Sequence, residues 1–117
     1  MAGHPIVHVE LSANDREAAG KFYSELFGWQ VQDHPEMNYA TFEAAGGPGG
    51  GFAPVGGNMP AGQTLVHVGT DDIDASLAKV EQLGGTTLMP KTEIPNIGWF
   101  GLFKDPTGNI VGLYTAK

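Results

Sequence analysis

The chain has no cysteine and little positive charge. None of its 117 residues is cysteine, which excludes disulfide scaffolds, thiolate zinc sites and cysteine nucleophiles. It has 6 lysine and arginine residues against 13 acidic ones, a formal net charge of −7. So few scattered cations cannot form the basic patch that binds nucleic acid or an anionic membrane, and we expect neither partner. The lack of cysteine fits a reducing compartment, and we expect a cytoplasmic protein.

Long apolar runs are also missing. No stretch approaches the roughly 18 apolar residues of a membrane-spanning helix, and the longest apolar runs have the length of strands. Residues 1–5 show no basic region followed by an apolar run, so we expect no signal peptide. Residues 46–51 are rich in glycine, but they match no phosphate-binding motif, and no nucleophile elbow occurs. We expect a single domain over residues 1–117.

The chain does contain a weak internal repeat. Residues 7–11 and 65–68 alternate as strands do, and each is followed by a helix N-cap, an apolar helical pattern and a terminal glycine. Further strand patterns follow each helix, at 29–31, 39–42 and 52–55 and again at 86–89, 99–103 and 110–114. The repeat predicts an α+β fold of two βαβββ modules, about 1–57 and about 63–117. We expect their mixed or antiparallel sheets to curve around a shared cup.

Two histidines and a glutamate are expected on one face of these strands. Side chains alternate along a strand, and the valine-rich faces of residues 7–11 and 65–68 suit packing against the helices. His8, Glu10 and His67 then point away from the helices and into the cup. We interpret them as polar pocket residues. Each is also compatible with a hydrogen-bonded strand residue, and together they are compatible with a two-histidine, one-carboxylate metal site.

Two motifs stand out, F-Y-x-x-L-F-G-W at residues 22–29 and D-P-T-G-N at residues 105–109, which is followed by Leu113. They resemble motifs of the vicinal oxygen chelate superfamily, which includes glyoxalase I, extradiol dioxygenases and bleomycin-resistance proteins. The resemblance covers nearly the whole chain and implies paired βαβββ modules that usually assemble as a homodimer. Residues 90–100 are similar to small members without metal residues, and a proline-bounded loop of this kind can form a lid over a cup. Trp99 would then be a wall of the cup, or alternatively part of the core.

The same resemblance locates the positions of metal ligands. Catalytic members hold a divalent metal with two ligands from each module, and these positions fall on His8, Leu65 and Gly112 and near Gly51. Leucine and glycine side chains cannot ligate a metal, and zinc, nickel or iron sites need three or four donors. We therefore expect no metal and no cofactor. Glu10 and His67 leave a shifted metal site as an alternative.

The sequence thus predicts a metal-independent protein that binds a small, partly apolar ligand. The expected ligand-binding residues are His8, Glu10, Leu65, His67, Trp99, Phe103, Gly112 and Tyr114. One alternative is a lyase or isomerase that acts on a small carbonyl metabolite by histidine–glutamate acid–base chemistry. Another is a metal-dependent glyoxalase- or dioxygenase-like enzyme with a rearranged site.

Overall fold

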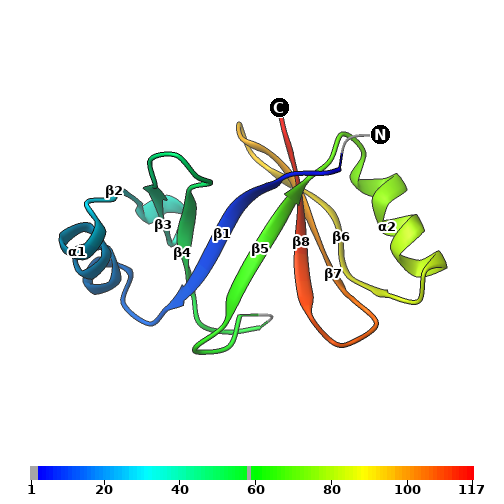
Figure 1. The fold of residues 1–117 in the computed structure, drawn as a ribbon, viewed down its shortest axis with the longest axis horizontal. Helices are drawn as coiled ribbons and strands as arrows, with labels where there is room; N and C mark the ends of the chain where they lie inside the picture. The colour runs from blue at the N-terminus through cyan, green and yellow to red at the C-terminus, as the bar shows by residue number, and fades with distance from the viewer. Residues whose placement is uncertain (1–2, 58) are drawn as a thin grey trace. The chain divides into compact units, whose positions relative to one another are not determined.

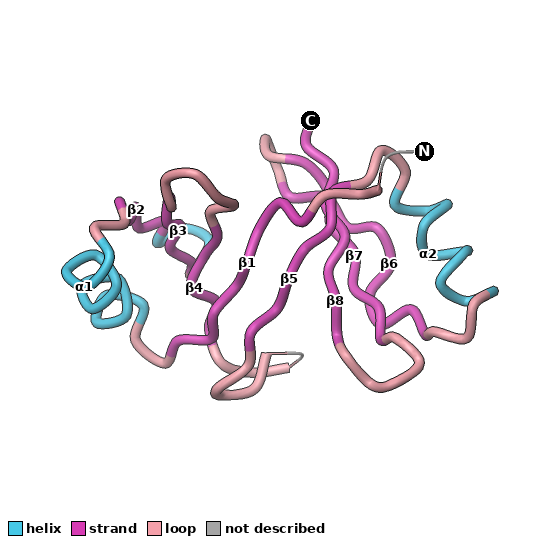
Figure 2. The backbone as a smooth tube through the Cα atoms, viewed as in Figure 1, coloured by secondary structure: helices cyan, strands magenta, loops and turns pink. Residues whose placement is uncertain are grey.

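The computed structural model describes residues 3–57 and 59–117. It divides into two compact units, a first unit of residues 7–65 and a second unit of residues 66–117 with the N-terminal stretch up to Ile6. Along the chain, the order strand, helix and three strands occurs twice (Figures 1 and 2). This confirms the predicted α+β fold of two βαβββ modules. No helix among the described residues has the length and apolar character needed to cross a membrane.

The first module forms a mixed sheet in the order β2-β3-β4-β1, in which β1 and β4 are parallel and the other neighbours antiparallel. Its elements are β1 (Ile6–Ala13), α1 (Arg16–Phe27), β2 (Gln30–His34), the short 3-10 helix η1 (Pro35–Met37), β3 (Tyr39–Glu43) and β4 (Gly50–Pro54). The glycine-rich segment leads directly into β4. A Cβ on Gly50 would overlap the carbonyl of Val9, so glycine is needed where β4 runs beside β1.

The second module repeats this mixed sheet in the order β5-β8-β7-β6, with β5 and β8 parallel. Its elements are β5 (Thr64–Gly69), α2 (Ile73–Gln82), β6 (Thr86–Ile94), β7 (Gly98–Lys104) and β8 (Ile110–Ala116). Of the segment expected to form a lid, residues 90–94 are instead the second half of β6, which pairs with β7 as far as Ile94. Pro90 is accommodated because it falls at a register shift between Met89 and Thr92.

The two helices begin as the sequence predicts. The Asp15 side chain accepts a hydrogen bond from the backbone N–H of Ala18 at 3.1 Å, and Asp72 accepts one from Ala75 at 2.9 Å. At its other end, α1 stops at Gly28, whose φ of 74° lies in the left-handed region that glycine adopts readily.

A separate core joins each helix to one face of its own sheet. In the first unit the buried residues are Ala40, Phe42 and Phe52, with Leu11, Ala13, Ala19, Tyr23, Trp29 and Val31 packed against them. In the second unit they are Ile73, Leu77 and Leu113, with Val68, Trp99 and Phe103 packed against them. We call the opposite face of each sheet its helix-free face.

Candidate functional site

His8 and Glu10 lie on the helix-free face of the first sheet. Leu11 and Ala13 of the same strand pack into the core under α1. Because side chains alternate along β1, His8 and Glu10 point to the other face, as the sequence pattern predicts. Both residues are half-buried.

Tyr39 of β3 joins these two side chains. Its hydroxyl donates a hydrogen bond to Glu10 Oε2 at 2.8 Å and lies 2.7 Å from His8 Nε2. The rings of Tyr39 and His8 are nearly parallel, with centroids 6.3 Å apart. Sequence reasoning missed Tyr39, although the burial of Ala40 and Phe42 on the same strand agrees with an alternation that turns Tyr39 to the helix-free face. We call His8, Tyr39 and Glu10 the polar trio.

The hydroxyl of Tyr39 is held in its neutral form. Burial raises the pKa of Tyr39 far above its ordinary value of 10.0, and the negative charge and hydrogen bond of Glu10 raise it further. The phenol therefore stays protonated at neutral pH and acts as a hydrogen-bond donor. A hydrogen bond to an ionised acceptor is roughly twice as strong as one between neutral groups. Tyr39 is thus firmly tied to the carboxylate of Glu10.

Gly51 provides the space that Tyr39 occupies. It pairs with Glu10 between β1 and β4 and with Thr41 between β3 and β4. A Cβ on Gly51 would overlap the hydroxyl and the ring of Tyr39. The polar trio therefore requires glycine here. The resemblance to the vicinal oxygen chelate superfamily implies a carboxylate near this position, and a phenol fills the space instead.

His67 and Gly112 form a similar arrangement in the second sheet. His67 of β5 pairs with Gly112 of β8 and is 6% exposed. A Cβ on Gly112 would overlap the imidazole of His67, so glycine again makes room for a side chain from the neighbouring strand. Leu65 is two residues before His67 and Tyr114 is two residues after Gly112, which turns both side chains to the helix-free face.

Trp99 and Phe103 lie on the opposite face of the second sheet. Both pack against the cluster of Ile73, Leu77 and Leu113 beneath α2. Side chains alternate along β7, so Trp99 and Phe103 point towards the helix, whereas His67 lies on the helix-free face of the sheet. Of the two roles considered for Trp99, the packing agrees with the core. The ammonium groups of Lys91 and Lys117 lie 5.1 and 5.4 Å from its ring centroid.

The residues at the expected ligand positions do not fit a metal. Within 3–57 and 59–117, no three or more His, Asp or Glu side chains gather in a group that could hold one. Leu65 has no donor atom, and the side-chain space at Gly51 and Gly112 is filled by Tyr39 and His67. His8 keeps its imidazole but is hydrogen-bonded to Tyr39. We therefore derive no chemistry through a bound metal.

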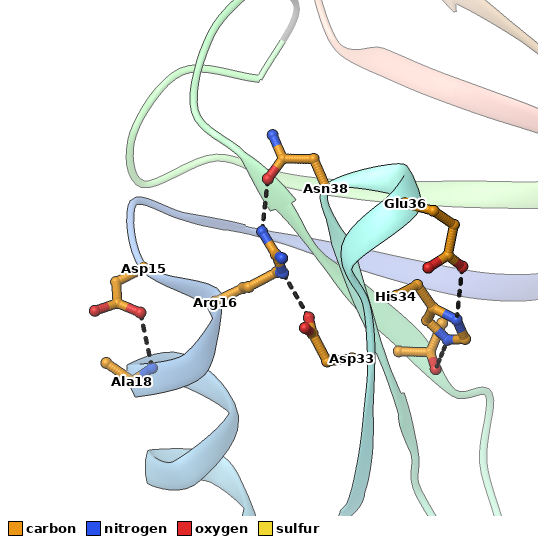
Figure 3. Close-up of polar contacts among 8 residues, drawn as sticks. Asp15, Arg16, Ala18, Asp33, His34, Glu36 and Asn38 are labelled. Carbon is orange, nitrogen blue, oxygen red and sulfur yellow. Dashed lines mark hydrogen bonds and ion pairs between the residues drawn. The ribbon is translucent and has the colours of Figure 1, made fainter.

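A groove of about 650 Å³ lies beside α1 in the first unit. It is lined by Asn14, Asp15, Arg16, Glu17, Gly20, Lys21, Ser24, Val31, Asp33 and Ala40. Arg16 donates to Asp33 at 2.5 Å and to the side chain of Asn38 at 2.6 Å (Figure 3). The hydrogen bond from Arg16 lowers the pKa of Asp33. These contacts tie the start of α1 to β2 and to the residue before β3, which is a structural role that sequence reasoning did not identify.

Comparison with known proteins assigns the chain to a family. Residues 8–113 match the model of the glyoxalase-like domain. A Mycobacterium bovis protein named "Putative glyoxylase CFP32" is 35% identical over 116 residues, which cover 93% of this chain and 44% of that protein. A glyoxylase-like domain-containing protein of Didymella fabae is 30% identical, over 92% of this chain and 90% of its own length. The chain thus spans less than half of the first relative and most of the second.

Solved structures share the fold. A glyoxalase/bleomycin resistance protein/dioxygenase superfamily member from Vibrio splendidus 12B01 has a TM-score of 0.69 to this chain. The match covers 97% of this chain and 99% of that one, at 13% sequence identity. At this identity the likeness concerns the fold, and the chemistry has to be argued from the residues of this chain.

Proposed function

The chain belongs to the glyoxalase-like domain family of the vicinal oxygen chelate superfamily, and from this premise we propose that it binds a small molecule without a metal. The proposed binding groups lie on the helix-free faces. In the first module they are the polar trio, and in the second they are His67 with Leu65, Gly112 and Tyr114. Trp99 and Phe103 are left out of the proposed surface because they pack beneath α2. The shared cup predicted from the sequence stays a prediction.

One observation carries the proposal of metal independence. The resemblance implies that ligand positions of the superfamily fall on Gly112 and near Gly51, and the side-chain space of each glycine is filled by a residue of a neighbouring strand that can form hydrogen bonds. A carboxylate introduced at either position would first have to displace Tyr39 or His67. Metal binding needs three or four donors, whereas hydroxyl and imidazole groups suit the recognition of a polar part of an organic ligand.

The character of the proposed ligand follows from the groups that would meet it. Tyrosine rings favour an apolar portion of the ligand, and the hydroxyl, imidazole and carboxylate groups favour hydrogen bonds. The net charge of −7 disfavours polyanions and favours neutral or cationic molecules. We propose a small, partly apolar compound with one hydrogen-bonding end.

A second candidate function is acid–base catalysis on a small carbonyl compound, as a lyase or isomerase. The hydrogen-bonded chain from His8 through Tyr39 to Glu10 favours it, because imidazole titrates near neutral pH and a carboxylate stabilises its charged form. For any carbonyl substrate that the protein converts, we expect His8→Ala to abolish turnover while circular dichroism shows a folded protein. An unchanged rate would exclude this candidate.

The proposed function is tested by metal analysis and ligand screening on one preparation. Protein purified without chelator or polyhistidine tag should contain zinc, nickel, iron and manganese well below one atom per chain. A metabolite and antibiotic panel should include a compound that raises the melting temperature saturably, with and without EDTA. His8→Ala should weaken that shift, and His4→Ala should not, because His4 is an exposed residue outside the site. A stoichiometric metal, or a shift that EDTA removes, would contradict the proposal.

The homodimer implied by the superfamily resemblance is a separate proposal. Sedimentation velocity should give a species of twice the chain mass at micromolar concentration. A monomer over the whole concentration range would contradict it and would leave the proposed binding groups of each unit unaffected.

A further inference from the structure

The polar trio contains few hydrogens, and their number restricts how they are shared. Tyr39 has one hydroxyl hydrogen, which is directed to Glu10 Oε2 at 2.8 Å. The hydroxyl oxygen of Tyr39 also lies 2.7 Å from His8 Nε2. Once its hydrogen is given to Glu10, the hydroxyl can only accept at that second contact. The hydrogen between Tyr39 and His8 therefore has to come from His8 Nε2.

The reverse arrangement is unfavourable. If Tyr39 donated to His8 Nε2, its oxygen would face Glu10 Oε2 at 2.8 Å without a hydrogen between them. Two oxygen atoms at this distance repel unless one carries a proton, and the half-buried setting strengthens the repulsion. In this contact the carboxylate of Glu10 is the acceptor and supplies no such proton. The order of donation therefore runs from His8 to Tyr39 and from Tyr39 to Glu10.

We propose that Tyr39 is a positioning residue that holds His8 in the tautomer with its hydrogen on Nε2. In this tautomer Nδ1 carries no hydrogen. Tyr39 also sets the direction of the ring, since its hydroxyl is itself tied to Glu10 on the same strand as His8. The hydroxyl of Tyr39 thus determines which ring nitrogen of His8 carries the hydrogen.

Gly51 is the second part of this arrangement. A side chain there would overlap both the ring and the hydroxyl of Tyr39 and would push the phenol away from Glu10. Gly112 gives the His67 ring the same kind of space in the second unit. In both units the glycine has no side chain that could ligate a metal. The space that such a side chain would need holds a ring from the neighbouring strand.

The proposed tautomer adds detail to the proposed function. It rests on that function only for the role of His8 towards a bound ligand. The position of the hydrogen on His8 is a property of the protein without any ligand. Failure of the ligand screen would therefore leave the tautomer intact, and a different tautomer would leave metal-independent binding intact. The two proposals are separated by their measurements.

The tautomer is measured by long-range proton–nitrogen correlation of ¹⁵N-labelled protein near neutral pH, with His8 assigned by its loss in His8→Ala. We expect His8 to show a protonated Nε2, an unprotonated Nδ1, and an Nε2 hydrogen that exchanges slowly with water. A spectrum with the hydrogen on Nδ1 would overturn the proposal directly, without recourse to any variant of Tyr39.

Two variants then test the role of Tyr39. In Tyr39→Phe the Nε2 hydrogen loses its acceptor, so we expect its protection to disappear and the two tautomers to mix. Gly51→Ala should have the same effect with Tyr39 still present, because the added methyl group displaces the phenol. Tyr23→Phe, on the core side of the same unit, should leave the His8 spectrum unchanged. An unchanged His8 spectrum in a folded Tyr39→Phe or Gly51→Ala protein would overturn the assignment.

Discussion

The two units have the same order of strands and fill their cores with different residues. The first core is aromatic: Phe42 and Phe52 pack with Tyr23 and Trp29, and the rings of Trp29 and Phe42 stack at 4.3 Å. The buried residues of the second core, Ile73, Leu77 and Leu113, are aliphatic. The fold therefore requires an apolar layer between helix and sheet rather than particular side chains. Aromatic and aliphatic side chains both provide such a layer.

The helix-free faces differ more deeply than the cores. The first face holds a charged and hydrogen-bonded trio, whereas the second holds one buried histidine beside Leu65 and Tyr114. Both faces nevertheless use a glycine to admit a ring from the next strand. The two sheets thus have a glycine at matching positions beside β1 and β5, whereas the residues around the two glycines differ. Four groups of substitutions test these regions, and they are ordered by expected effect.

The largest effect is expected in the aromatic core of the first unit. Phe52 is 1% exposed, and Phe52→Ala should lower the free energy of unfolding by about 3–5 kcal/mol, since it leaves a large cavity. Ile73 is also 1% exposed, and Ile73→Val in the second unit should lower it by only about 0.5–1.5 kcal/mol. Urea unfolding followed by circular dichroism measures both. Equal losses would contradict the idea that the large rings organise the first core.

Tyr39→Phe should have the next largest effect. Loss of the hydrogen bond to Glu10 should lower the free energy of unfolding by about 1.5–3 kcal/mol near neutral pH. The pKa of Tyr39 is raised in the folded protein, so its stabilising effect is full below the unfolded value of 10.0 and declines above it. Urea midpoints between about pH 8 and about pH 11 should therefore fall more steeply in the parent protein than in the variant. Parallel curves would contradict the raised pKa.

A methyl group at either special glycine should also destabilise the protein. We expect Gly51→Ala and Gly112→Ala each to lower the free energy of unfolding by about 1–3 kcal/mol, because Tyr39 or His67 must move. Gly47→Ala is the matched control, since nothing lies within 4 Å of its added Cβ, and it should change stability by less than about 0.5 kcal/mol. Thermal and urea unfolding of the three variants provide the comparison. A neutral effect at Gly51 would argue against the close approach of Tyr39.

The smallest effect is expected in the turn between β7 and β8. The side-chain hydrogen bond from Asn109, with others from this turn, lowers the pKa of Asp105 to about 2. A lowered pKa stabilises the fold above the unfolded value of 3.8, and this contribution is lost as the pH falls towards about 2. Asp105→Ala should therefore lower the melting temperature near pH 6 and flatten its acid dependence. Asn109→Ala should have the same effects to a smaller degree. An unchanged dependence of the melting temperature on acidic pH in Asp105→Ala would contradict the lowered pKa of Asp105.

Much of the fold could be predicted because its signals are local. The N-caps at Asp15 and Asp72 act within one helical turn, and the alternation of residues 7–11 depends only on the pleat of one strand. These predictions are confirmed. The second half of β6 was wrongly expected to be a lid, because Pro90 is typical of loops and only pairing with β7 keeps the chain extended beyond it.

The candidate site was predicted less completely for a related reason. His8, Glu10 and His67 share the expected facing because each follows from its own strand. Trp99 and Phe103 were expected among the ligand-binding residues, but they pack beneath α2, because the sequence does not show which side of β7 meets that helix. Tyr39 carried no motif, and its role depends on a contact with a residue 29 positions away.

The sequence by itself determined the two modules, their helix boundaries and the polar character of one strand face, since these follow from neighbouring residues. Only the tertiary structure decided that the Tyr39 hydroxyl stands between His8 and Glu10, and that the spaces at Gly51 and Gly112 are occupied. Which ring enters the space above a glycine depends on the register of strands that are distant in the chain. That register is set by the packing of the whole sheet, and no local pattern encodes it.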